Sequence, residues 1–398
     1  MRLFFSVGEP SGDQHAAHLV DELSRRVPNI EIAGFGGPLM QKRGIDLLYP
    51  LTELAVMGIV QVLPLIRKFR GLVRQAEAYF DHQAESGNPV DGVVLVDFPG
   101  FNWWIARAAK RRGIPVFYYC PPQLWAWASW RIRKMRRNVD HVLCCHPFEA
   151  AWYLERNMPA EHVGHPFYDE IAEKKLDGKF LEEQRLKSQG QVTVAILPGS
   201  RNGEIRHNWP LQVEVMRRLS AERPNLRFLT ACYRDHQRET CERHLTEKNL
   251  NLPVELCVGK TSEILEVCDL CYMVSGSVSL EVMSRGKPAV VLYHVDRLFA
   301  LLAKLLVRCR WMSLPNLIEG QTVIPEFPLY GSAREGIEEM TTLLGKWIDD
   351  PEELKRKTME MRELRDRVAV TGGIGKAADA ILKRLPAHSV SPRDRLVA

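Results

Sequence analysis

The stretch "DGVVLVDFPGFNWWIARAAKRRGIPVFYYC", residues 91–120, decides the fold class. A run of apolar and small residues leads into Asp97, and the chain then turns at residues 98–100. Apolar periodicity and the closing Gly113 predict a helix, and "IPVFYYC" is typical of a second buried strand. Strand, helix and strand in this order predict a parallel sheet covered by helices.

The same alternation recurs along the chain. Strand-like runs such as "RLFFSVG" and "DHVLCCHP" precede a polar stretch that begins near residue 165, and a second series follows from "VTVAILPGSR" to "PAVVLYHV". We therefore expect two doubly wound α/β domains with a cleft between them, and ligands outside the carboxyl ends of the strands. The expected boundaries are 1–170, 171–365 and 366–398, the last being a C-terminal helix that packs back on the first domain, plus a mobile tail.

The composition is typical of a folded protein. Of the 398 residues 45% are hydrophobic and 26% charged, and the longest apolar runs are interrupted before the ~20 residues of a membrane span. The first residues predict a strand and not a signal peptide, and the nine cysteines favour reduced thiols in a cytosol.

The charge is unevenly distributed, although the net charge is only +5. Nine Lys or Arg and no Asp or Glu lie between Arg107 and Arg137. Such a block could meet phosphates of nucleic acid, anionic lipid or a phosphorylated substrate, or it could be a solvated basic face. A nucleic-acid-binding module is the non-enzymatic alternative, because Trp125, Trp127 and Trp130 interleave with these bases.

The strand ends of the first half carry two candidate carboxylates. "VGEPSGDQHAA" places Glu9 and Ser11 between a strand and a helix, where they suit a sugar-hydroxyl site or simply a helix start with Ser11 or Asp13 as the cap. Asp97 ends a buried strand, where a carboxylate is costly unless it is solvated or used.

Two loops of the second half fit a nucleotide diphosphate. In "ILPGSR" a strand ends in Gly199, Ser200 and Arg201, and arginine suits a diphosphate because it is always charged and binds bidentately; a surface salt bridge is the alternative. In "MVSGSVSLE" the small residues 275–277 can line a phosphate, and Glu281 can bind a ribose or serve only the helix start.

Three further motifs carry less weight. "AGFGGP" is a weak nucleotide fingerprint, and "TGGIGKAA" lacks the spacing and the hydroxyl of an ATPase loop. Cys268 and Cys271 form a C-x-x-C within an apolar run with no second pair at zinc spacing, which favours buried core cysteines.

A set of motifs in fixed order resembles one family. "GEPSGD", "ELAVMGIVQVLP", "VDFPGFN", "PPQLWAW", "HVGHP", "LPGSR", "SGSVSLE" and "MSLPNLI" extend over nearly the whole chain and resemble the lipid-A-disaccharide synthases. Departures from the family pattern are Cys120-Pro121-Pro122, where a serine-bearing loop is more usual, and Gly100, where an acidic residue is common.

The resemblance implies a GT-B fold and an inverting, metal-independent glycosyltransferase. In such an enzyme we expect domain 1–170 to bind the acceptor and domain 171–365 to bind the UDP-sugar. It implies transfer of 2,3-diacylglucosamine from its UDP derivative to 2,3-diacylglucosamine 1-phosphate, giving a β-1,6-linked disaccharide and UDP at the cytosolic face of the inner membrane. No cofactor is expected, and a homodimer is left open. The alternative enzymes are other sugar-nucleotide enzymes, such as a UDP-N-acetylglucosamine epimerase or a peptidoglycan glycosyltransferase.

An inverting transfer needs a base for the acceptor hydroxyl and donors for the departing UDP. Its position at a strand end and the resemblance both favour Asp97 as the base, with Glu9 as the alternative. We expect the following contacts to UDP and substrate: Gly199, Ser200, Arg201, Ser275, Gly276, Ser277 and Glu281 for UDP, and Ser11 and Asn316 for substrate. No metal ligand is expected.

Lipid substrates suggest membrane-facing segments. Residues 296–311 and 54–70 predict wide apolar helices with basic residues, which suit an interfacial helix or a buried one with snorkelling ends. The expected membrane or acyl contacts are Met57, Val60, Leu63, Arg297, Leu301, Lys304 and Arg308.

Overall fold

The computed structural model describes residues 1–54, 65–295, 309–330 and 333–385. The chain divides into an N-terminal unit, residues 1–169 together with the segment from 371, and a C-terminal unit, residues 170–370. These are the compact units of the structure; the acceptor and donor roles predicted for the two domains stay predictions.

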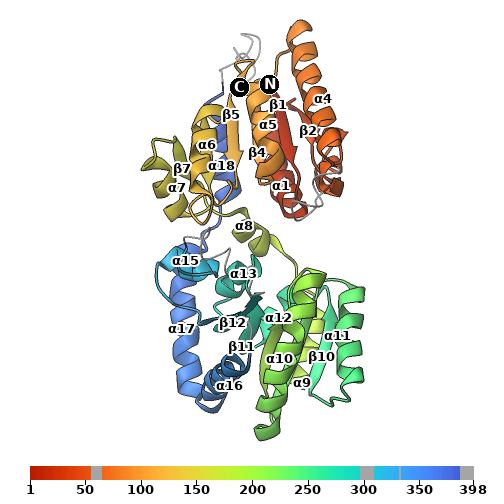
Figure 1. Cartoon of the computed structure of the whole chain (residues 1–398), viewed down its shortest axis with the longest axis vertical. Helices are drawn as coiled ribbons and strands as arrows, with labels where there is room; N and C mark the ends of the chain where they lie inside the picture. Colours follow the sequence, from red (N-terminus) through yellow and green to blue (C-terminus); the bar gives the residue numbers. More distant parts are fainter. Residues whose placement is uncertain (55–64, 296–308, 331–332, 386–398) are drawn as a thin grey trace, which may run out of the picture. The chain divides into compact units, whose positions relative to one another are not determined.

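The N-terminal unit is a parallel sheet of seven strands in the order β3-β2-β1-β4-β5-β6-β7 (Figure 1). The strands are β1 (Arg2–Val7), β2 (Glu31–Phe35), β3 (Asp46–Tyr49), β4 (Gly92–Val96), β5 (Val116–Tyr119), β6 (His141–Cys144) and β7 (Ala160–His162). The helices are α1 (Pro10–Arg26), α2 (Pro38–Gln41), α4 (Ile66–Glu85), α5 (Pro99–Lys110), α6 (Ile132–Asn138), α7 (Pro147–Leu154) and α18 (Gly373–Leu382), with short 3-10 turns η1 (Leu51–Leu54) and η3 (Ser129–Arg131). Helix α8 (Pro166–Glu173) crosses the boundary between the units.

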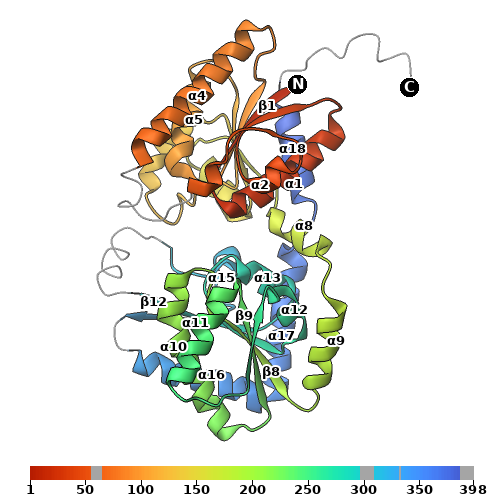
Figure 2. The ribbon, with the colours of Figure 1, turned by 90° about the vertical axis from the view of Figure 1, so that its right-hand side faces the viewer.

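Alternation along the strands divides the core of this unit into two layers. Phe4 of β1 faces a cluster formed with α4, α5, α6 and α7, whereas its neighbours Leu3 and Phe5 face a cluster formed with α1 and α18. Side chains of successive strand residues point to opposite faces, so both faces are covered. Helix α18 lies beside α1 (Figure 2), where Asp379 pairs with Arg26.

The C-terminal unit repeats the topology with six parallel strands in the order β10-β9-β8-β11-β12-β13. The strands are β8 (Val192–Leu197), β9 (Leu226–Cys232), β10 (Val254–Val258), β11 (Leu270–Val274), β12 (Ala289–Val295) and β13 (Glu326–Tyr330). The helices are α9 (Gly178–Lys187), α10 (Asn202–Glu222), α11 (Asp235–Glu247), α12 (Thr261–Val267), α13 (Val278–Ser284), α15 (Leu314–Glu319), α16 (Arg334–Asp349) and α17 (Pro351–Val368). Both orders are Rossmann-like, so the predicted pair of doubly wound α/β units is confirmed.

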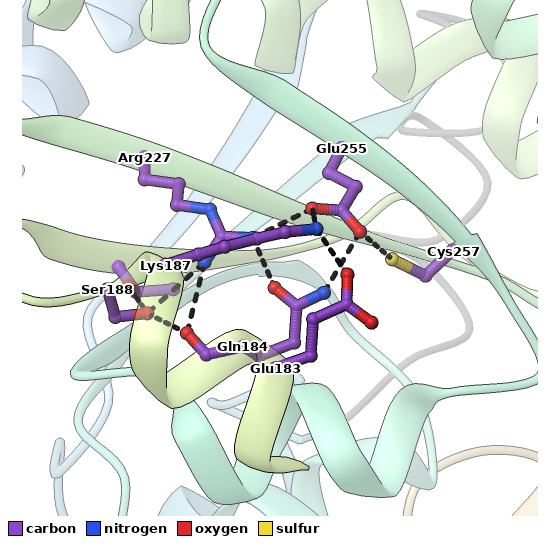
Figure 3. A network of polar contacts seen from close by, with 8 residues as sticks. Glu183, Gln184, Lys187, Ser188, Arg227, Glu255 and Cys257 are labelled. Atoms are coloured by element: carbon purple, nitrogen blue, oxygen red, sulfur yellow. Dashed lines mark hydrogen bonds and ion pairs between the residues drawn. The ribbon is translucent and has the colours of Figure 1, made fainter. Parts of the chain in front are cut away.

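A polar network fastens α9 to the amino-terminal part of this second sheet (Figure 3). The buried guanidinium of Arg227 on β9 donates to Glu255 Oε2 at 2.7 Å and to Ser188 Oγ at 3.2 Å. Gln184 of α9 donates to Glu255 Oε1 at 2.9 Å. Burial of a charged group is tolerated only when it is paired in this way, so the network is a stability element at the sheet end opposite the loops discussed next.

Candidate functional site

Each sheet has one switch point, where the strand order reverses. In the N-terminal unit it lies between β1 and β4, whose last residues Val7 and Val96 are paired, so Glu9 and Asp97 follow neighbouring strand ends. In the C-terminal unit it lies between β8 and β11, which are followed by Arg201 and by the loop 275–277. Ligands of open α/β sheets bind at such points, and the predicted base and diphosphate residues flank both of them.

The turn after β4 holds Asp97 in an uncommon conformation. Asp97 has φ 47° and Phe98 has φ 44°, so two successive non-glycine residues are left-handed before Pro99 opens α5. The Asp97 carbonyl accepts hydrogen bonds from Asn102 Nδ2 and from the Tyr118 hydroxyl, each at 2.7 Å. These two donors fix the backbone that carries the carboxylate.

Left-handed backbone gathers at this edge of the sheet. Among the described residues seven non-glycine positions have positive φ, and three of them are asparagines, which tolerate it. The other four are Asp97, Phe98, Cys120 and Ala128, which follow the adjacent strands β4 and β5. Strain of this kind persists where the surroundings hold it and points to a functional site.

The end of β1 is shaped to admit the same turn. A Cβ at Gly8 would lie 2.1 Å from Cδ1 of Phe98, so only glycine lets the two turns approach. Glu9 is the N-cap residue of α1, and Ser11 is exposed in its first turn. Asp13 is no cap of α1, because its buried carboxylate accepts from the amides of Gly37 and Leu39, each at 2.9 Å.

The environment of Asp97 suits a proton acceptor. Burial raises the pKa of its carboxyl group, while a hydrogen bond from the Phe98 amide and the nearby His15 act in the opposite direction. A base with a raised pKa holds a proton more firmly once it has taken it. The carboxylate is therefore suited to general base catalysis.

Two buried polar residues that the sequence motifs do not indicate stabilise the loops at this edge of the sheet. Glu149, on α7, accepts from Trp125 Nε1 at 3.0 Å and from the amides of Cys145 and His146, and burial raises the pKa of its carboxyl group to about 7. Asn102 is buried and also accepts from Ser6 Oγ at 2.6 Å. Two features of the sequence could have pointed to these residues. Glu149 stands three residues after the helix N-cap, as in a capping box, and Asn102 is the one amide side chain in an apolar helix.

The loop after β8 is organised by Glu204 in the first turn of α10. Its Oε2 accepts from the amides of Ser200 and Arg201 at 3.0 and 3.2 Å, and its Oε1 pairs with Arg201 Nη1 at 2.8 Å. Gly199 has φ 112° and an added Cβ would lie 2.7 Å from Glu204, so glycine is required there. The Arg201 side chain is 60% exposed, so its ion pair is weak and can be exchanged for a phosphate at low cost.

The loop after β11 and the helix that follows it contain two exposed residues and two residues whose side chains are bonded within the protein. Gly276 and Ser277 are exposed, whereas Ser275 Oγ donates to the Met312 carbonyl at 3.1 Å. Glu281 is 6% exposed and its Oε1 accepts from Arg285 Nη2 at 3.0 Å. Its predicted contact to ribose stays a prediction, and the pair with Arg285 accounts for its conformation here.

Asn316 is occupied within the protein. Its Nδ2 donates to the Ile324 carbonyl and to Glu326 Oε1, and its Oδ1 accepts from the amides of Val323 and Ile324, all within 2.8 Å. The side chain is fully buried, so these bonds order the "SLPN" turn, and its predicted substrate contact remains a prediction.

The predicted membrane contacts lie outside the described residues: Met57, Val60, Leu63, Arg297, Leu301, Lys304 and Arg308. In the described part of the chain, no helix combines the length and apolar character that crossing a membrane requires. The same described residues contain no cluster of three or more His, Cys, Asp or Glu arranged to hold a metal ion.

Comparison with known proteins gives the family. Residues 3–367 match the family described as lipid-A-disaccharide synthetase. The chain belongs to this family. It is 34% identical over 386 residues to the lipid-A-disaccharide synthase of Myxococcus xanthus, covering 97% of this chain and 98% of that protein. It is 31% identical to the synthase of Geobacter metallireducens, with 96% and 97% covered.

Solved structures show the same fold at low identity. A UDP-GlcNAc 2-epimerase from Neisseria meningitidis bound to UDP-GlcNAc has a TM-score of 0.59 at 14% identity, covering 96% of this chain and 99% of the other. The S. aureus MnaA–UDP structure has a TM-score of 0.62 at 13% identity, with 96% and 95% covered. The GT-B fold is thus confirmed, and membership of the lipid-A-disaccharide synthases makes the chain a glycosyltransferase of lipid A biosynthesis, which is favoured over the epimerase and nucleic-acid alternatives.

Proposed function

We propose that the protein transfers 2,3-diacylglucosamine from UDP-2,3-diacylglucosamine to 2,3-diacylglucosamine 1-phosphate, with inversion, and releases UDP. Membership of the synthase family supports the reaction class. The single structural observation that carries the mechanism is the partly buried Asp97 carboxylate, held on a left-handed turn at the β1–β4 switch point.

Asp97 takes the proton of the acceptor 6-hydroxyl as that oxygen attacks the anomeric carbon of the donor. Its backbone is fixed by Asn102 and Tyr118, so the carboxylate is in place before substrate arrives. Such preorganisation avoids rearrangement during the chemical step. Glu9, on the adjacent strand end, is the alternative base.

The C-terminal unit binds the donor in this proposal. Arg201 releases its exposed pair with Glu204 and binds the diphosphate, whose negative charge grows as the glycosidic bond to phosphate breaks. The amides and hydroxyls of residues 199–200 and 275–277 add donors, and Glu281 binds the ribose. No step requires a metal ion.

We further propose that the protein acts as a peripheral protein at the cytosolic face of the inner membrane, where both acylated sugars reside. Exposed bases of α6, Arg133, Lys134, Arg136 and Arg137, support this, because each basic residue near an anionic surface contributes on the order of 1 kcal/mol. Binding to phosphatidylglycerol vesicles that falls with added salt would support it, and equal binding to neutral vesicles would contradict it.

The reaction is tested with defined substrates. Purified protein incubated with both diacylated sugars is expected to form a disaccharide 1-phosphate and an equal amount of UDP. UDP-N-acetylglucosamine without acyl chains is the matched control donor, and it is not expected to react. Equal use of this control donor would overturn the substrate assignment, and interconversion of its C2 epimers without transfer would show an epimerase.

A further inference from the structure

The loop that follows β5 carries a cation for which the described residues provide no anionic partner. Arg131, at the end of η3, has its Nε and Nη2 atoms shielded from solvent and without a hydrogen-bond partner within the described residues. Its guanidinium stacks on the indole of Trp127, 4.1 Å from the ring centroid. A shielded guanidinium with unused N–H groups is costly, so its retention requires a reason.

Nothing near Arg131 in this loop neutralises it. No Asp or Glu occurs between Arg107 and Arg137. The carboxylate that ties the loop to α7, Glu149, is occupied by Trp125 and by two backbone amides. Burial lowers the pKa of the Arg131 guanidinium, and Tyr118 and Tyr153, which act in the opposite direction, are polar groups close to it.

The position of Arg131 relates it to the candidate base. Tyr118 lies within electrostatic reach of both Arg131 and Asp97, and its hydroxyl donates to the Asp97 carbonyl at 2.7 Å. The loop carrying Arg131 leaves β5 at the same edge of the sheet where β4 delivers Asp97. Tyr118 therefore lies near both the cation and the turn of the base.

The loop is also held rigidly. Cys120 and Ala128 both have left-handed backbone, with φ 48° and 52°, and the Tyr153 hydroxyl donates to the Pro122 carbonyl at 2.9 Å. A cation on a fixed loop is preorganised for a ligand, because its position is set before binding.

We propose that Arg131 is the anion subsite of the N-terminal unit and binds a phosphate monoester, the 1-phosphate of the acceptor sugar. This rests on the proposed function for the identity of the ligand. In the acceptor, C1 carries the phosphate and C5 carries the 6-hydroxymethyl group, and both carbons are bonded to the ring oxygen. The two groups therefore belong to the same end of one sugar, which matches a cation and a base that both lie near Tyr118. Arginine suits a phosphate because its planar head group donates two parallel N–H···O bonds.

The test uses the full-length protein and Arg131→Met, with Arg111→Met as the control, since Arg111 is an exposed base of the same block. Transfer is measured with the acceptor 1-phosphate and with the same diacylated sugar lacking phosphate. Arg131→Met is expected to raise the KM for the phosphorylated acceptor by about 10- to 100-fold, to leave the KM for the donor unchanged, and to abolish the preference for the phosphorylated acceptor. Arg111→Met should change none of these.

Direct binding separates this inference from the reaction itself. Glucosamine 1-phosphate is titrated while tryptophan fluorescence is recorded, because Trp127 stacks on the guanidinium. Wild type and Arg111→Met should bind it and Arg131→Met should not, even if the transfer reaction is assigned wrongly. Vesicles of phosphatidylglycerol should bind Arg131→Met as well as wild type, since the phosphate comes from the acceptor and not from a lipid headgroup.

The Tm of the unliganded protein distinguishes the proposed ligand-binding role of Arg131 from a structural one. Removing a shielded, unpaired charge should leave the Tm of the unliganded protein unchanged or higher. A lower Tm with equal losses on both acceptors would assign Arg131 a structural role and overturn the proposal, as would wild-type protein that does not bind glucosamine 1-phosphate. If Arg131→Met does not fold, Arg131→Lys decides: it keeps the charge and loses the fork, so its phosphate affinity should fall while binding persists.

Discussion

Replacing Asp97 by asparagine tests the mechanism with little disturbance of the fold. Asparagine tolerates left-handed backbone, and the bonds from Asn102 and Tyr118 end on the main-chain carbonyl, so neither is lost. What disappears is the ability to accept a proton. General base catalysis contributes about 10²- to 10⁴-fold, or roughly 3–5 kcal/mol of barrier, so kcat should fall by this factor.

The assay follows disaccharide formation from the two diacylated sugars, with UDP affinity measured separately by calorimetry. UDP affinity of Asp97→Asn should equal that of wild type, because the base acts only in the chemical step. Glu9→Gln is the matched control on the neighbouring strand end and should keep kcat within a few-fold. An Asp97→Asn enzyme that retains most of its kcat, or a Glu9→Gln enzyme that loses it, would refute the assignment.

The pKa of Asp97 gives this prediction a pH signature. The base must be ionised, so kcat/KM falls as the pH drops through its pKa, and burial moves that acidic limb above the range of an ordinary aspartate. The folded state binds this proton more tightly than the unfolded state, so ionisation of Asp97 lowers the free energy of unfolding. This loss is absent below the pKa of the unfolded state and complete above the pKa of the folded state. Asp97→Asn should therefore be at least as stable as wild type at pH 7, measured by thermal unfolding, and should lose the acidic limb.

Three further substitutions probe the donor loop, a departure from the family and the polar network of Figure 3. Arg201→Ala should weaken UDP binding by about 10-fold or more in calorimetry and lower kcat as well, since a charge-assisted bond to phosphate is lost; unchanged UDP affinity would contradict the donor site. Gly100→Ala should stabilise the first turn of α5 by about 0.5–1 kcal/mol in denaturant unfolding with activity retained, because an added Cβ meets nothing within 4 Å; a loss of stability would show a hidden constraint there. Arg227→Met should lower the unfolding free energy by about 2–3 kcal/mol, less than for a fully buried pair because Glu255 is partly exposed, while kcat per folded molecule stays unchanged.

The strands, and the residues at their carboxyl ends, could be predicted from the sequence because they depend on local patterns. Buried runs such as residues 92–96 and 270–274 are typical of strands in parallel sheets, and in each sheet the polar residues that follow the strands lie at the edge formed by the carboxyl ends. This reasoning places Asp97 and Arg201 at strand ends, whereas the strand order that makes these ends switch points is seen only in the structure.

The interaction partners of individual side chains could not be predicted in the same way, because they depend on how the chain packs in three dimensions. Asn316 in "SLPN" looked free to meet substrate, yet Glu326, ten residues later on β13, accepts its amide, and so the motif orders a turn. Glu281 looked available for a ribose because a carboxylate suits the start of a helix, but Arg285, one turn later, pairs with it. In both cases the sequence shows the residue type but not its partner within the protein, and the predicted contacts to substrate and ribose stay predictions.

In the basic block, the charge count concealed differences between individual residues. Counted together, the bases between Arg107 and Arg137 fit nucleic acid, anionic lipid, a phosphorylated substrate or a solvated face equally well. Most of α6 fits a solvated or lipid-facing surface, since Arg133 and Arg136 are exposed, but Arg131 is set apart by its shielded N–H groups and its stacking on Trp127. Charge counts cannot separate these two roles because desolvation is a property of tertiary packing. The cost of holding one arginine without a carboxylate is what distinguishes a ligand site from a basic face, and the phosphate preference of Arg131→Met measures that difference.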